Sequence, residues 1–225
     1  MRTRLTQAVI SAGRVLLMLA GLSVAVALPA APQTSAVPAI SAPESSSQLE
    51  GAKLLNALRG GGYVLYFRHT STDFGANDDN MTSYADCATQ RNLTEQGRTE
   101  ARRIGAAIKS LAIPIGKVMA SPFCRTMETA QLMFGRAVAT PAVRGGPAQA
   151  DAERYADLRK LLSTPVERGS NAVIASHGNP FRAVVGGAYL AEGEAAVVEP
   201  RGAEGFRVVA RVRKDDWATL STAPP

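Results

Sequence analysis

The sequence predicts a three-layer α/β/α sandwich with a mostly parallel central sheet. Short apolar segments alternate with amphipathic ones through the middle of the chain, as strands and helices alternate in such folds. Residues 63–67 and 171–176 are nearly continuous apolar runs, which is typical of strands buried on both faces. Ligands of such sheets bind beyond the carboxyl ends of the strands. Side chains that directly follow these two segments are therefore the first candidates for a functional site.

The first two helices and the first strand of the predicted domain are predicted from the spacing of their apolar residues and from the residues that cap or end them. Four leucines in residues 48–62 recur at roughly helical spacing and precede three glycines, which predicts a helix that ends there. A buried strand at 63–67 comes next. Thr94 is the predicted N-cap of an amphipathic helix that ends before Pro114. Its apolar face consists of Ala101, Ile104, Ile108 and Leu111.

The remaining elements are predicted from the same patterns. In chain order they are a strand at 116–121, a short helix from 125 closed by Gly135, a weak strand near 137–143, a helix through 151–162, a strand at 171–176, a helix at 180–190, and two edge strands at 195–200 and 206–212.

The N-terminal region differs in composition from the rest of the chain. Three arginines precede an apolar stretch from Val15 to Ala27, which is followed by small residues and prolines, the layout of a secretory signal. Two sites suit cleavage, Ala25-Val26-Ala27 and Leu28-Pro29-Ala30. An uncleaved membrane anchor is the alternative, although the apolar stretch is shorter than the about 20 residues that a spanning helix needs. We expect a periplasmic or secreted protein with no stable membrane insertion after cleavage.

These features predict the division of the chain. Residues 30–47 are mostly Ala, Pro and Ser, a composition that buries too little apolar surface to fold and is typical of linkers. We therefore expect a signal peptide at 1–29, a linker at 30–47 and one domain at 48–225.

The charge balance is modestly basic. The chain has 25 basic and 19 acidic residues, and residues 1–46 hold three Arg and one Glu, so the remainder carries 22 against 18, a net charge of +4. No run of like charges and no alternation of basic and aromatic residues indicates nucleic-acid binding.

Cys87 and Cys124 are the two cysteines of the chain. An even number in an exported protein permits a disulfide, which would tie the loop after His69 to the segment carrying Arg125. Two free, buried cysteines are the alternative.

The candidate site consists of cationic and imidazole side chains that follow three different strands. Arg68 and His69 end the first strand, Arg125 follows the second, and His177, the other of the chain's two histidines, follows the strand at 171–176. Two guanidinium groups can clamp a tetrahedral anion, and the helix opening after Arg125 would add backbone N–H donors. A neutral imidazole there can attack phosphorus in line, and neighbouring arginines keep it unprotonated by lowering its pKa. The pattern predicts phosphoryl chemistry.

Three motifs in this order resemble the histidine phosphatase superfamily, also called phosphoglycerate mutase-like. They are Arg68-His69-Thr70, the segment SPFCRTMETA from Ser121 to Ala130, and His177-Gly178. The resemblance extends from about Tyr63 to Leu190. It implies a phosphoglycerate mutase-like fold, with His69 as the nucleophile that becomes a phosphohistidine. It further implies that Arg68, Arg125 and His177 bind the phosphoryl group, and it implies no metal and no cofactor.

The sequence also departs from the family pattern. Thr70 replaces the usual glycine, which alters a close backbone approach to phosphate. The third motif continues with Asn179, so the aspartate donor of the exported acid phosphatase branch is missing, as is the glutamate segment of the mutases. Glu153 stands where short members similar to lipopolysaccharide core heptose phosphatases carry an acid, and Asp151 and Asp73 are the alternatives. A solvated carboxylate at a helix start would also explain Glu153.

We therefore expect an exported, metal-independent phosphomonoesterase that acts on a small phosphorylated substrate, such as a phosphosugar. A phosphoprotein (phosphohistidine) phosphatase is one alternative. An inactive relative that binds phosphorylated glycans is another, motivated by Thr70 and the uncertain acid. The long acidic loop at 71–87 is either a lid over the site or a solvated connection.

Overall fold

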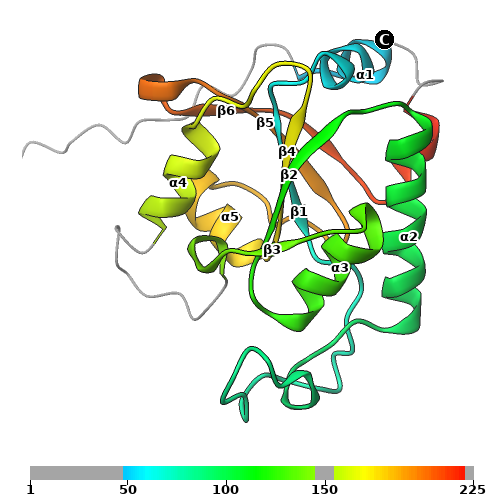
Figure 1. Ribbon diagram of the computed structural model, residues 1–225, viewed down its shortest axis with the longest axis vertical. Coiled ribbons are helices and arrows are strands. Elements are labelled where there is room, and N and C mark those ends of the chain that lie inside the picture. Colours follow the sequence, from blue (N-terminus) through cyan, green and yellow to red (C-terminus); the bar gives the residue numbers. More distant parts are fainter. Residues whose placement is uncertain (1–47, 145–154, 221–225) are drawn as a thin grey trace, which may run out of the picture. The chain divides into compact units, whose positions relative to one another are not determined.

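The computed structural model describes residues 48–144 and 155–220, and the predicted signal peptide and linker lie outside them. The described residues form a six-stranded sheet in the order β3-β2-β4-β1-β5-β6 (Figure 1). The prediction of a mostly parallel α/β sheet is confirmed, since the first four strands are mutually parallel and β5 is antiparallel to both of its neighbours. The strands are β1 (Val64–Arg68), β2 (Ile115–Ala120), β3 (Val138–Ala139), β4 (Asn171–Ser176), β5 (Ala195–Pro200) and β6 (Phe206–Val212).

Helices cover both faces of the sheet (Figure 1). Leu65 and Phe67 of β1 point into a core shared with one set of helices, whereas Val64 and Tyr66 point into the core on the other face. This alternation follows from the two-residue period of a strand, and it explains why β1 is apolar throughout. The first face carries α1 (Gly51–Gly60), α2 (Glu95–Ser110) and α3 (Cys124–Phe134), and the second carries α4 (Ala156–Ser163) and α5 (Gly178–Val185).

Several boundaries differ from the predictions. The helix expected at 180–190 ends at Val185 because Gly186 and Gly187 both adopt positive φ angles. The segment 195–200 was expected at an edge, but β5 lies between β1 and β6 and its first four residues are buried. The weak strand near 137–143 consists of two residues followed by a 3₁₀ turn. No helix within the described residues is long and apolar enough to cross a bilayer.

The start of α2 is joined tightly to the segment after His69. The Thr94 side chain caps α2 by accepting a hydrogen bond from the Gly97 N–H at 3.0 Å, as predicted, and the Thr94 N–H donates to the Ser71 carbonyl. A Cβ atom on Gly97 would lie 2.1 Å from the Ser71 carbonyl oxygen, so only glycine allows this approach. Glu100 accepts hydrogen bonds from both the N–H and the hydroxyl of Ser71. These contacts fix the chain immediately beyond the nucleophile candidate.

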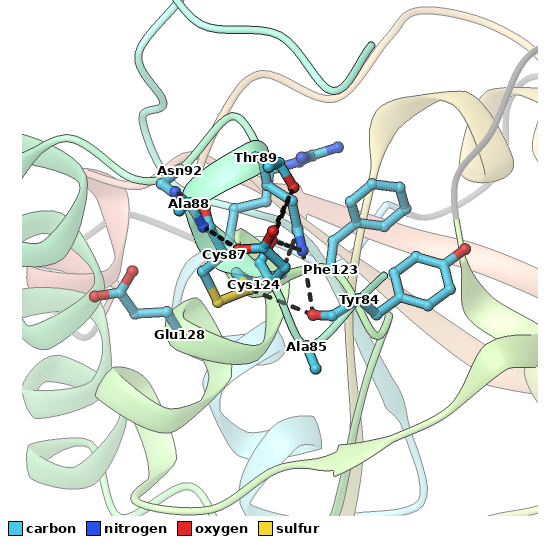
Figure 2. The surroundings of a disulfide bond; sticks show 12 residues. Tyr84, Ala85, Cys87, Ala88, Thr89, Asn92, Phe123, Cys124 and Glu128 are labelled. Carbon is cyan, nitrogen blue, oxygen red and sulfur yellow. Dashed lines mark hydrogen bonds between the residues drawn. A yellow bond between two sulfur atoms is a disulfide. The ribbon is translucent and has the colours of Figure 1, made fainter. Parts of the chain in front are cut away.

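Cys87 and Cys124 form a disulfide, which decides between the two alternatives left open by the sequence. The bond joins a 3₁₀ turn (Cys87–Thr89) in the loop before α2 to the first residue of α3 (Figure 2). Gln90 makes a second connection beside it, because its Oε1 accepts a hydrogen bond from the Cys124 N–H at 2.9 Å. Its amide nitrogen donates to the carbonyls of Ser83, Tyr84 and Asp86. The loop is therefore held against the N-terminus of α3 by covalent and polar contacts.

Removing the disulfide is expected to lower the free energy of unfolding by about 3–4 kcal/mol. The bond closes a separation of 37 residues, and that loss is what the chain-entropy model gives for a loop of this length. The double variant Cys87→Ser/Cys124→Ser should be compared with the oxidised parent by urea denaturation. An unfolding midpoint equal to that of the parent would contradict a stabilising role for the bond.

Candidate active site

The structure brings the four predicted side chains to one cavity of about 510 Å³. Arg68 ends β1 and is paired in parallel register with Ser176, the last residue of β4. The residues that follow, His69 and His177, are therefore neighbours, with ring centroids 5.6 Å apart. Arg125 enters the cavity from the first turn of α3. The parallel register of β1 and β4 is thus the physical reason why two histidines that each follow a strand lie side by side.

His69 is held in the form that a nucleophile requires. Its Nδ1 lies 2.9 Å from the Thr70 carbonyl oxygen, which can only accept, so Nδ1 carries the proton and Nε2 keeps its lone pair. Burial, followed by the guanidinium groups of Arg125, Arg68 and Arg91, lowers the pKa of His69 to about 3, although the Thr70 carbonyl opposes the shift. The ring is consequently neutral at physiological pH.

His177 is fixed from two sides. Its Nε2 lies 2.9 Å from the hydroxyl of Ser121, the first residue of the second motif, and its carbonyl accepts a hydrogen bond from the Tyr66 hydroxyl at 2.8 Å. Burial, and then Arg125, lower its pKa well below the usual value. Sterics explain why glycine follows His177, because a Cβ on Gly178 would lie 2.4 Å from the ring of Tyr189.

Arg125 is nearly fully buried and carries a free donor. Its Nη1 donates to Asp78 Oδ1 at 2.9 Å and to the Arg91 carbonyl at 3.2 Å, while its buried Nε has no hydrogen-bond partner among the described residues. Its guanidinium carbon Cζ lies 4.4 Å from the centroid of the Phe123 ring. A buried guanidinium with an unused donor is suited to an anionic ligand.

The helix that was expected to open after Arg125 begins one residue before it, at Cys124. The N–H of Cys124 donates to Gln90, and those of Thr126 and Met127 donate to the Phe123 carbonyl. These three backbone donors are already engaged within the protein, and the expectation that the start of α3 supplies N–H donors to the ligand stays a prediction. The guanidinium groups are left as the main anion donors from this side of the cavity.

The loop before α2 also lines the cavity, and two of its residues, Arg91 and Asp78, bear directly on anion binding although they were not among the predicted phosphate ligands. Arg91 brings a third guanidinium group, whose buried Nε has no hydrogen-bond partner in the described chain. Asp78 accepts hydrogen bonds from Arg125 and from the Arg91 N–H at 2.9 Å. Burial raises the pKa of Asp78, but these hydrogen bonds outweigh burial and hold it below its ordinary value. A carboxylate thus occupies part of the anion-binding surface.

The other predicted positions are placed as follows. Thr70 is fully buried and does not line the cavity, since its hydroxyl lies 3.3 Å from that of Thr129 on α3. Asp73 does not line the cavity either, because its carboxylate is exposed and accepts from the Gly75 N–H. Glu153 and Asp151 lie outside the described residues, and the described part of the helix expected there begins at Ala156. The role predicted for Glu153 therefore stays a prediction.

The charge of the cavity favours an anion. Three guanidinium groups and two neutral imidazoles face one space, opposed by the carboxylates of Asp78 and Asp79. Within the described residues, no group of three or more His, Cys, Asp or Glu side chains is arranged to hold a metal ion. A tetrahedral dianion is the ligand that forked guanidinium donors and a free imidazole nitrogen fit best.

Comparisons with solved structures give 113 matching chains. The protein histidine phosphatase SixA in complex with tungstate is 18% identical, with a TM-score of 0.49, over 68% of this chain and 97% of SixA. The Entamoeba histolytica phosphoserine phosphatase bound to 3-phosphoglyceric acid is 15% identical, with a TM-score of 0.47, over 66% and 95%. The mycobacterial glucosyl-3-phosphoglycerate phosphatase bound to inorganic phosphate is 15% identical, with a TM-score of 0.48, over 68% and 99%.

None of the curated proteins compared with the chain matches it. The family model described as histidine phosphatase superfamily (branch 1) matches residues 64–146. The matched stretch contains β1 with Arg68 and His69, and the second motif with Arg125. The third motif lies beyond it, but the structure places His177 beside His69. In its three motifs and in this match over residues 64–146, the chain is similar to the histidine phosphatase superfamily.

Proposed function

We propose that the protein hydrolyses phosphomonoesters through a phosphohistidine formed on His69, without a metal ion. The observation that carries the proposal is the state of His69, a neutral imidazole with Nδ1–H bonded to a carbonyl and with Nε2 free, in a cavity lined by three arginines. The match of residues 64–146 to the histidine phosphatase family model supports the same chemistry.

In the first step, the lone pair of His69 Nε2 forms a bond to phosphorus as the bond from phosphorus to the ester oxygen breaks. The electron pair of that bond stays on the departing oxygen, which takes a proton from an acid. Arg68, Arg91 and Arg125 hold the charge on the equatorial oxygens, and His177 adds a further contact. In the second step, water attacks phosphorus, the P–N bond breaks, and the conjugate base accepts the proton of the water. We assign that acid and base to Glu153.

The disulfide supports export to an oxidising compartment, as the N-terminal sequence predicts, because such bonds are rare in reducing cytosol. The cavity volume falls within the range of small-molecule sites, which favours a small ester over a protein surface as the substrate. Asn77, Asp79 and Asn179 line the cavity together with Tyr189, and such polar groups suit the hydroxyls of a phosphosugar.

The proposal is tested by assaying the purified, oxidised protein with para-nitrophenyl phosphate in the presence of excess EDTA. We expect turnover that is insensitive to the chelator, and we expect inorganic phosphate to inhibit it competitively. A panel of phosphosugars and a phosphohistidine peptide would then separate the small-ester proposal from a phosphoprotein phosphatase. Phosphate binding without hydrolysis of any of these substrates would instead identify a binding relative.

A further inference from the structure

Glu192 lies behind the nucleophile, in the loop between α5 and β5. Its Oε1 is 3.8 Å from His69 Nδ1, the ring nitrogen opposite the one that attacks. The same oxygen accepts hydrogen bonds from the Thr72 hydroxyl at 2.7 Å and from Arg68 Nη2 at 3.4 Å. The side chain is 14% exposed, and Glu192 is the carboxylate of the described residues that lies within 4.0 Å of the neutral His69 ring.

The position of Glu192 is fixed by the backbone as well as by its side chain. The N–H of the next residue, Gly193, donates to the His69 carbonyl at 2.9 Å, and the Arg68 N–H donates to the Glu194 carbonyl at 3.1 Å. Thr72 holds both carboxylate oxygens, because its N–H donates to Oε2 at 3.3 Å. The carboxylate is therefore held at a set distance from the ring before any substrate binds.

Phosphoryl transfer changes the charge on that ring. When Nε2 of the neutral imidazole bonds to phosphorus and Nδ1 keeps its proton, the imidazole becomes a cation. Burial of the ring, and then the three guanidinium groups that line the same cavity, lower its pKa, so a positive charge on the ring is unfavourable. A carboxylate close to Nδ1 stabilises that cation by Coulomb attraction in a poorly solvated environment.

We infer that Glu192 is a positioning residue that stabilises the positive charge developing on His69 as Nε2 takes the phosphoryl group. The inference rests on the proposed phosphohistidine chemistry. Glu192 acts through His69 and does not line the cavity, so its effect on the chemical step separates from its effect on phosphate binding. Its negative charge beside Arg68 opposes the binding of a dianion while it assists the transfer.

Because Glu192 should assist the transfer but oppose phosphate binding, removing its charge should change the two quantities in different directions. A purely structural role would not produce this pattern. In Glu192→Gln the side chain keeps its shape and an oxygen that accepts from Thr72, but it loses its charge and one of the two acceptor oxygens that Thr72 contacts. We expect the burst rate constant for phosphorylation, measured by rapid quench with saturating para-nitrophenyl phosphate, to fall about 10- to 100-fold. The Kd for inorganic phosphate, measured by calorimetry, should stay equal or decrease.

Two variants make the comparison specific. Glu199→Gln removes one negative charge on β5 from a surface pairing with Arg201 and Arg207, and it should leave both quantities unchanged. Glu192→Asp retains the charge and should recover part of the burst rate.

Three results would overturn the inference. One is a Glu192→Gln variant as fast as Glu199→Gln. Another is a slower variant that also binds phosphate more weakly, because that pattern indicates a misplaced Arg68. The third is the absence of a phosphohistidine in the parent protein. That result would also overturn the proposed function, whereas the first two results would leave it standing.

Discussion

Replacing His69 with alanine is expected to lower the turnover of an activated aryl phosphate by at least about 10³-fold. The substitution removes the Nε2 lone pair that we propose attacks phosphorus, while the three cavity arginines remain to bind the ester. With an activated leaving group little help from an acid is needed, so the loss reports on the nucleophile itself. The measurement is initial-rate hydrolysis of para-nitrophenyl phosphate by parent and variant, with inorganic phosphate binding as the check that the site is intact.

The chain's two histidines provide a matched control for this prediction. His177→Asn removes the neighbouring imidazole but leaves the nucleophile, so an acid-labile, alkali-stable phosphoryl adduct should still form, at a lower rate. That adduct should be absent from His69→Ala quenched during turnover. If the adduct disappears from the His177 variant and persists without His69, the two roles have been assigned the wrong way round.

The sequence was sufficient to predict the fold class and the position of the site because both depend on strong local patterns. β4 is apolar throughout and is buried over all six residues, and its ends coincide with the predicted ones. A parallel sheet brings successive strand ends to one edge, so Arg68, His69 and His177 could be grouped without coordinates. The end of α5 at Val185 is set locally by Gly186 and Gly187, a signal that the predicted helix at 180–190 ran through. The length of the strand near 137–143 depended on tertiary context, which local patterns do not contain.

The loop residues of the site could not be predicted in this way. Arg91, Asp78 and Glu192 belong to connections whose course is set by contacts distant in the sequence. One signal was available for Arg91. If Cys87 is bonded to Cys124, then Arg91, four residues after the first cysteine, must lie near Arg125, one residue after the second. No comparable signal pointed to Glu192, which is 123 residues from His69 and carries no motif.

Replacing Arg125 with lysine is expected to lower kcat/KM for the same ester by about 10²- to 10³-fold, although the positive charge is kept. Lysine has no planar fork and cannot replace the buried Nε donor that has no partner among the described residues. The ammonium group would also lose the stacking of the guanidinium on Phe123. We expect the Kd for inorganic phosphate to rise as well, because the proposed role of Arg125 is to bind the phosphoryl group both before and during transfer.

The hydrogen bond between Asp78 and Arg125 affects how a change in phosphate affinity is interpreted. Its carboxylate accepts a hydrogen bond from Arg125 Nη1 at 2.9 Å, so phosphate must compete with it for that donor. Weakening the hydrogen bond between Arg125 and Asp78 would, by itself, favour phosphate binding. A net loss of phosphate affinity in Arg125→Lys therefore reports the contribution of the planar guanidinium group. Arg102→Lys on the exposed face of α2, where the arginine pairs with Glu95, is the matched control and should behave as the parent. Equal phosphate affinity in the two variants would show that Arg125 serves to hold Asp78 and the loop before α2, and that the phosphoryl group is bound by Arg68 and Arg91.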